Sequence, residues 1–147
     1  MALSELGMLI MQLNRKEPQF HNFALHTLLE RSQKSNEVYR YWSVLEFKLL
    51  NKNPIQQKAG LLLLSANTKW DEKNRLDLII DDYLALASGK NFEIALICIQ
   101  SLKDILPFKP KLQNHIKCKL KELDFSNWND QQINTLKLSI QELFSFT

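Results

Sequence analysis

Turn-forming residues are scarce in this sequence. Its 147 residues include 3 glycines and 4 prolines, whereas 45% of them are hydrophobic and 24% are charged. Sandwiches and barrels need many tight turns, and tight turns need glycine or proline. The composition therefore favours long helices joined by short connections, and the length fits one globular domain over residues 1–147.

Cysteine and arginine are scarce as well. The two cysteines, Cys98 and Cys118, lie in separate predicted helices without CxxC spacing, which is typical of reduced thiols in the cytosol. Lysine supplies most of the 19 basic residues, and lysine is a weaker group than arginine for phosphates and guanine edges. The net charge of +3 is therefore weak evidence for nucleic acid. Arginine occurs only at Arg15, Arg31, Arg40 and Arg75.

Long hydrophobic runs are absent near the start of the sequence. The longest such run, Met8 to Met11, is far shorter than a membrane-spanning helix. Residues 1–13 also lack the basic segment and the small-residue cleavage site of a signal peptide. We expect a cytoplasmic protein that does not enter a membrane.

Helix-capping signals are frequent. Asn53 and Gln56 have the spacing of a capping box, and Pro54 suits the first helical position between them. Asn129 and Gln132 repeat the box before the last helix. No stretch alternates as a strand does. The predicted helices lie at residues 3–13, 18–33, 37–50, 54–66, 73–87, 91–106, 110–122 and 130–145.

Two patterns repeat along the chain with a period near 36 residues. The first consists of apolar triplets in the odd-numbered helices: Tyr41, Leu45 and Leu49, then Leu76, Ile80 and Leu84, then Leu112, Ile116 and Leu120. The second pairs a small residue with a leucine four positions later in the even-numbered helices: Ala24 and Leu28, Gly60 and Leu64, Cys98 and Leu102. Two registers with one period indicate a helical-hairpin repeat, in which Gly60 lets paired helices lie close. The predicted fold is an all-α superhelix of about four stacked hairpins.

The period and the hairpin units resemble HEAT and armadillo-type repeats. Several strings also resemble an uncharacterised family of small bacterial HEAT-like proteins: Val38-Tyr39-Arg40-Tyr41-Trp42, Lys69-Trp70-Asp71, Ile79-Ile80-Asp81-Asp82-Tyr83-Leu84, Cys98-Ile99-Gln100-Ser101-Leu102 and Phe108-Lys109-Pro110. This likeness covers roughly residue 20 to the C-terminus and implies a fold but no activity and no cofactor. Trp70 and Asp71 also resemble, more faintly, the groove residues of HEAT-like alkylpurine DNA glycosylases, which implies nucleic-acid binding as the alternative function.

Catalytic patterns are missing. The three histidines, His21, His26 and His115, have no metal-ligand spacing, and no serine or cysteine stands in a nucleophile motif. Acidic residues gather around the fifth predicted helix (Asp71, Glu72, Asp77, Asp81, Asp82), and lysines around the seventh (Lys109, Lys111, Lys117, Lys119, Lys121). We interpret both groups as solvated faces, although the lysines could meet an acidic partner. We predict no catalytic, cofactor or metal site and no enzymatic activity.

Aromatic residues mark a candidate protein-binding edge. Tyr39, Trp42, Trp70 and Phe108 fall at or just before the starts of odd-numbered helices. They are either binding anchors or staples between repeats, and the sequence leaves both open. The even-numbered helices predict a polar groove suited to a peptide, with Gln19, Asn22, Gln57, Lys58, Glu93, Gln100, Gln132 and Asn134. The leading hypothesis is a binding scaffold for an unidentified protein or peptide, and a second copy could cover Leu143, Phe144 and Phe146.

Overall fold

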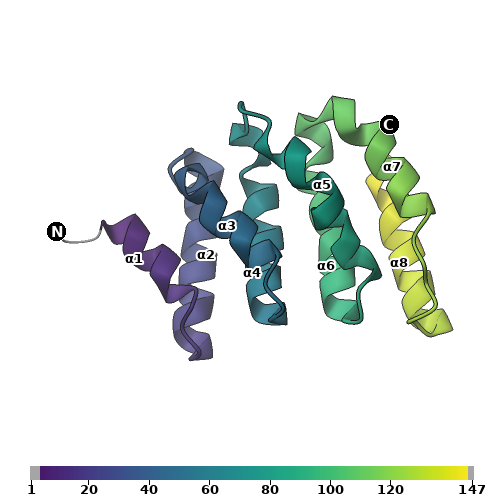
Figure 1. The fold of residues 1–147 in the computed structure, drawn as a ribbon, viewed down its shortest axis with the longest axis horizontal. Coiled ribbons are helices and arrows are strands. Elements are labelled where there is room, and N and C mark those ends of the chain that lie inside the picture. Colours follow the sequence, from purple (N-terminus) through teal and green to yellow (C-terminus); the bar gives the residue numbers. More distant parts are fainter. Residues whose placement is uncertain (1–3, 146–147) are drawn as a thin grey trace. The chain divides into compact units, whose positions relative to one another are not determined.

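The protein is helical throughout the part that the structure describes. A computed structural model describes residues 4–145. These residues form eight α-helices and several short 3-10 turns and contain no strand, which confirms the predicted all-α class. The chain divides into two compact units, residues 1–71 and 72–147. Figure 1 draws the first unit in purple to blue-green and the second in teal to yellow. The expectation of a single domain stays a prediction.

The first unit contains two helical hairpins (Figure 1). Its elements are α1 (Glu5–Gln12), α2 (Pro18–Lys34), the 3-10 turn η1 (Val38–Tyr41), α3 (Trp42–Leu49), α4 (Pro54–Ala66) and the 3-10 turn η2 (Thr68–Trp70). Local capping chemistry sets two of the helix starts. The Ser4 side chain accepts a hydrogen bond from the Gly7 amide, and the Asn53 side chain accepts one from the Ile55 amide.

The capping box predicted for α4 is only half correct. Asn53 caps the helix, but Gln56 does not return to the backbone of Asn53. Instead its Nε2 donates to the Leu13 carbonyl over 2.8 Å, and its Oε1 accepts from Lys48 Nζ over 2.6 Å. The long-range partners replace the local one because Lys48 is buried and needs acceptors.

Gly60 permits the close packing of α3 on α4. A Cβ atom at this position would lie 2.8 Å from the Leu49 backbone nitrogen and 3.2 Å from the Leu45 carbonyl oxygen. Backbone atoms cannot move aside as a flexible side chain can, so the helices approach this closely only without a side chain. The predicted role of Gly60 is therefore confirmed.

The second unit has more irregular connections than the first. Its elements are α5 (Arg75–Ala85), η3 (Leu86–Ser88), α6 (Phe92–Ser101), η4 (Leu102–Asp104), η5 (Leu106–Phe108), η6 (Pro110–Leu112), α7 (Gln113–Lys121) and α8 (Asp130–Leu143). The prediction that α-helix extends over 91–106 and from 110 onward is too long. Pro107 lacks an amide hydrogen and cannot continue the helix of α6, and the chain passes through the 3-10 turns η4, η5 and η6 before α7 begins at Gln113.

The capping box predicted before α8 is confirmed, because Asn129 and Gln132 form it completely. At the start of α6, the Asn91 side chain accepts a hydrogen bond from the Ile94 amide. The start of α5 was predicted two residues too early. Asn74 has a left-handed conformation with φ 55°, which asparagine tolerates, and the helix begins only at Arg75.

Both repeating patterns lie in the core. Ala24, Gly60 and Cys98 are buried, together with the leucine that follows each by four residues. The triplets of the odd-numbered helices are buried at Leu45, Leu49, Leu76, Ile80, Leu84, Ile116 and Leu120, and half-buried at Tyr41 and Leu112. The sequence pattern therefore predicted the interior correctly.

Candidate binding surfaces

The aromatic residues of the first unit pack inside it. Trp42 has no exposed surface, and its ring centre lies 5.4 Å from that of Tyr39. Trp70 is half-buried, and its Nε1 donates to the Ser32 carbonyl over 2.8 Å. The prediction of a binding edge needs correction at Trp42, since a fully buried ring cannot touch a partner. These side chains join neighbouring helices, as the staple interpretation expects.

Asp71 is held by the same aromatic group. It is buried, and its Oδ1 accepts a hydrogen bond of 2.5 Å from the Tyr39 hydroxyl. The resemblance to DNA glycosylases depended on Trp70 and Asp71, and both side chains are used in contacts within the first unit. Phe108 belongs to η5 of the second unit and is 52% exposed, so it alone among the four aromatics presents a large surface.

A pocket of about 550 Å³ opens in the second unit. Its lining comes from α6, the 3-10 turns η4 and η5, the start of α7 and the last turns of α8: Gln100, Lys103, Leu106, Pro107, Gln113, Ser139, Glu142 and Leu143. The volume lies within the usual range for a ligand-binding cleft. Gln100 was predicted to face a groove, and it lines this pocket.

The pocket combines an apolar floor with hydrogen-bonding groups. Gln113 Nε2 donates to the Leu106 carbonyl over 3.1 Å, which fixes the amide and leaves its oxygen for other donors. Lys103 and Glu142 are exposed and carry opposite charges. Such a lining can hold a ligand with both donors and acceptors.

The other predicted groove residues lie on the even-numbered helices as expected. Gln19, Asn22, Glu93 and Asn134 are exposed, whereas Gln57 and Lys58 are half-buried. Gln132 is engaged locally, because its side chain accepts from the Asn129 amide in the capping box. None of these side chains lines the pocket.

A second, smaller cavity of about 280 Å³ lies between α5 and α7, lined by Asp81, Leu84, Ala85, Ser88, Lys119, Leu120, Glu122, Leu123 and Asp124. Next to it, His115 Nε2 lies 2.6 Å from Asp81 Oδ1 on the exposed surface. The hydrogen bond from His115 lowers the pKa of Asp81, and hydrogen bonds from Ser126 lower the pKa of Asp124. The carboxylates of Asp81 and Asp124 therefore each accept a hydrogen bond from a residue of the same unit.

The lysine group around α7 includes one member that is not solvated. Lys109 is buried, with its Nζ 2.9 Å from Asp77 Oδ1 and 3.0 Å from Asn74 Oδ1. The interpretation of Lys109 and Asp77 as solvated residues is therefore wrong, because they pair with each other. Lys117, Lys119 and Lys121 are exposed as expected.

The C-terminal apolar run is partly accounted for within the unit. Leu143 and Phe144 are half-buried, and Lys117 Nζ lies 5.3 Å from the centre of the Phe144 ring. Phe146 lies outside the described residues. Self-association through this run stays a prediction.

The cysteines differ in accessibility. Cys118 is exposed and Cys98 is buried, and neither forms a disulfide. Burial raises the pKa of the Cys98 thiol, so this group stays protonated and unreactive. In residues 4–145, no three histidine, cysteine or acidic side chains gather so as to hold a metal ion.

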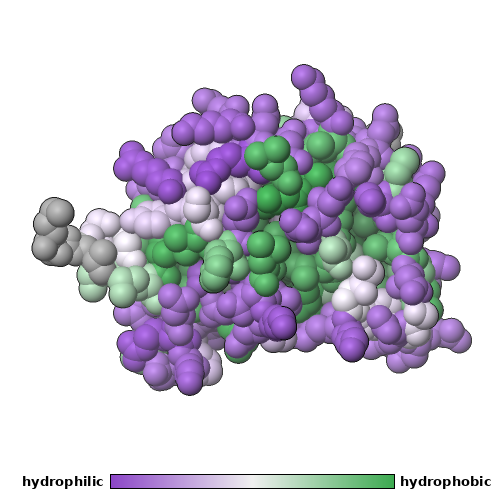
Figure 2. Space-filling view, in the orientation of Figure 1, coloured by the Kyte–Doolittle hydropathy of each residue, from purple (hydrophilic) through white to green (hydrophobic). Residues whose placement is uncertain are grey.

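Sequence reasoning missed an apolar face of the first unit. Met8 and Met11 of α1 are exposed, as are Val44 and Phe47 of α3 and Leu50 just after it. Figure 2 shows apolar side chains reaching the surface over α1 and α3. The sequence held a signal for this face, because both helices carry more apolar residues than one buried stripe needs.

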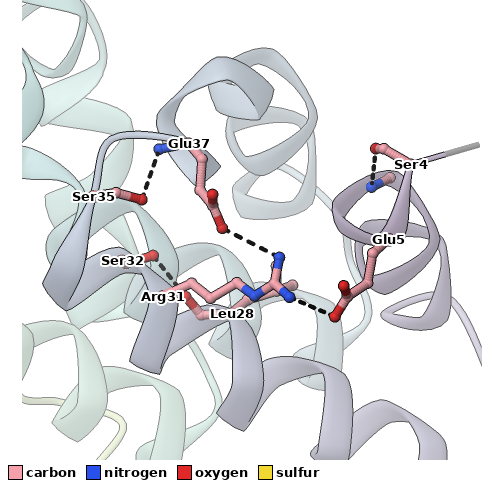
Figure 3. Close-up of polar contacts among 8 residues, drawn as sticks. Ser4, Glu5, Leu28, Arg31, Ser32, Ser35 and Glu37 are labelled. Atoms are coloured by element: carbon pink, nitrogen blue, oxygen red, sulfur yellow. Dashed lines mark hydrogen bonds and ion pairs between the residues drawn. The ribbon is translucent and has the colours of Figure 1, made fainter.

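Glu5, Arg31 and Glu37 form an ionic cluster beside this face (Figure 3). The Arg31 guanidinium lies 2.5 Å from Glu5 Oε1 and 3.2 Å from Glu37 Oε1. One cation thus connects α1, α2 and the residue before η1, and it compensates two carboxylates.

Comparisons with known proteins give no significant match to a protein-family model, to a curated protein or to a solved structure. Within the described residues, no helix is both long and apolar enough to cross a membrane.

Proposed function

We propose that this chain is a HEAT-like repeat module that binds a protein or peptide and catalyses no reaction. The observation that carries the proposal is the pocket of about 550 Å³ in the second unit. It offers an apolar floor together with the neutral side chains Gln100, Gln113 and Ser139. Peptide ligands need this combination, because each residue brings both a backbone donor and a backbone acceptor.

Polar contacts support the repeat architecture. Five side-chain pairs join residues 34 to 36 positions apart: Asn14–Lys48, Ser32–Asn67 and Gln33–Lys69 in the first unit, and Asn74–Lys109 and Asp81–His115 in the second. In a stack of repeats, equivalent positions of neighbours lie one period apart and touch. The separations match the period of the apolar patterns, as a solenoid requires.

Selection of random peptides displayed on phage against the immobilised chain tests the binding function. Selected peptides are then synthesised, and their affinity is measured by fluorescence anisotropy. Gln100→Ala and Ser139→Ala are each expected to weaken binding about tenfold, since each removes a hydrogen-bonding group from the pocket. Gln141→Ala is the matched control, because Gln141 is an exposed neighbour of Glu142 outside the lining.

Two outcomes contradict the proposal. Either the pocket variants bind selected peptides as tightly as the natural chain, or no peptide binds while a labelled DNA duplex does. In the second case affinity should fall steeply as salt rises, and the nucleic-acid alternative would replace the peptide.

A further inference from the structure

The first unit presents an apolar face that the rest of residues 4–145 leave exposed. Met8 and Met11 are 52% and 56% exposed, and Val44, Phe47 and Leu50 are 39%, 73% and 62% exposed. The residues are three apart on each helix, so they project from one side of α1 and one side of α3. We call these five residues the α1–α3 face.

The two helices of this face are neighbours. Lys48 Nζ, on α3, donates to Asn14 Oδ1 just beyond α1 over 2.7 Å. Gln56 Nε2, on α4, donates to the Leu13 carbonyl at the end of α1 over 2.8 Å. The first bond joins the end of α3 to the residues just after α1, and the second joins the start of α4 to the same segment, so the C-terminal ends of α1 and α3 lie close to each other.

The charge around the face is positive. Residues 1–71 contain nine basic and six acidic residues and carry a formal charge of +3, whereas residues 72–147 contain ten of each and carry none. Arg40 and Lys52 stand before and after α3, and Lys16 follows α1. All three are exposed, and none forms an ion pair within the described residues. The acidic residues nearest to Lys16 and Arg40 along the chain, Glu17 and Glu37, are compensated by Arg15 and Arg31. Glu46 of α3 is the acidic residue nearest to Lys52, and it leaves the three basic residues in excess.

We infer that the α1–α3 face binds an amphipathic helix of a partner protein, with acidic residues beside its apolar stripe. A helix suits this face better than an extended strand, because strand addition needs a sheet edge and residues 4–71 have none. Methionine side chains adapt to the shape of an apolar partner, and Phe47 is large enough to anchor one. Arg40, Lys52 and Lys16 would then meet the acidic flanks.

This inference does not depend on the pocket of the second unit. Gln100→Ala should leave helix binding unchanged, and substitutions in the α1–α3 face should leave peptide binding at the pocket unchanged. The two proposals can therefore fail separately.

The test uses two labelled synthetic helices that share a leucine stripe, one with glutamates and one with lysines beside it. The glutamate helix is expected to bind the full chain and the lysine helix is not, as measured by fluorescence anisotropy. Met11→Ser and Phe47→Ser should each weaken binding about tenfold, because each removes an exposed anchor. Leu78→Ser is the matched control, since Leu78 is 86% exposed and belongs to the second unit.

Charge reversal provides the second arm of the test. Arg40→Glu combined with Lys52→Glu should turn the preference toward the lysine helix, and circular dichroism melting shows whether each variant is folded. Equal binding of both helices overturns the inference, as does unchanged binding by Phe47→Ser. Two further results overturn it by revealing another occupant: phosphatidylglycerol vesicles bind while neither helix does, or light scattering detects a dimer that Phe47→Ser abolishes.

Discussion

The two units place their polar and apolar side chains differently. Among residues 4–145, eight of the large hydrophobic residues that are exposed belong to the first unit, and three belong to the second: Leu78, Phe108 and Leu138. Buried polar and charged residues show the same imbalance: the first unit has His21, Ser32, Lys48, Ser65, Asn67, Thr68 and Asp71, whereas the second has Ser101 and Lys109.

The two units therefore use their polar side chains for different purposes. In the first unit, buried hydrogen bonds such as Asn67 Nδ2 to Ser32 Oγ fix which helices meet, and apolar side chains are left on the surface. In the second unit, apolar side chains fill the interior, and the polar groups line a pocket. We therefore expect the first unit to be the more sensitive to loss of specific contacts, and the second to loss of apolar volume.

An exchange of equivalent residues tests this comparison most strongly. Leu102 stands 35 residues after Asn67, and both are fully buried. Leu102→Asn should lower the free energy of unfolding by about 4 kcal/mol, because it removes apolar volume and buries an amide without partners. Asn67→Leu should cost only about 1 to 2 kcal/mol, the loss of its two side-chain hydrogen bonds. Urea denaturation measures both, and equal costs would remove the distinction between the units.

The glycines provide the next largest effect. Gly60→Ala should lower the free energy of unfolding by about 2 kcal/mol, since the new Cβ would press on the backbone of Leu49. Gly89→Ala in the second unit is the control, because its Cβ would lie 3.6 Å from the nearest atom, an ordinary contact. That control should be neutral or slightly stabilising. A thermal melt compares the two, and a neutral Gly60→Ala would contradict the close packing of α3 on α4.

The buried Lys48 predicts a smaller, pH-dependent effect in the first unit. Burial lowers the pKa of Lys48 below its ordinary value of 10.5. Between the lowered pKa and 10.5 the unfolded chain binds more protons than the folded chain, so stability should rise with pH in that alkaline window. Lys48→Met should remove this rise and lower the free energy of unfolding by about 1 kcal/mol at neutral pH, because it removes the hydrogen bonds to Asn14 and Gln56. Urea denaturation as a function of pH measures both effects, and Lys52→Met is the control because Lys52 is exposed. If the Lys48→Met variant still becomes more stable at alkaline pH, another group causes the pH dependence.

The smallest effect concerns the exposed pair of Asp81 and His115. Because His115 lowers the pKa of Asp81, the pair stabilises the second unit above the ordinary carboxyl pKa of 3.8. That contribution is lost as pH falls through the lowered pKa. His115→Ala should raise the pKa of Asp81 toward 3.8 and leave the neutral-pH melting temperature almost unchanged. Carboxyl NMR titration measures the shift, and an unmoved Asp81 resonance would show that the pair does not form in solution.

Local signals predicted most of the helices but not the function of their side chains. Asn53 and Asn129 were predicted correctly as caps because capping involves residues only two or three positions apart. Gln56 was predicted incorrectly because its partners, Leu13 and Lys48, come from other helices. Trp42 was predicted as a binding residue from its place near a helix start, but its burial depends on the packing around it.

The sequence by itself determined the all-α class, the helix positions within a few residues and the identity of the core. These properties follow from periodicity and capping, which act within one or two helical turns. Only the tertiary structure decided which polar groups are buried with partners, which apolar residues stay exposed and where the pocket opens. The physical reason is that Lys48, Lys109 and Phe47 each owe their burial or exposure to helices distant in sequence.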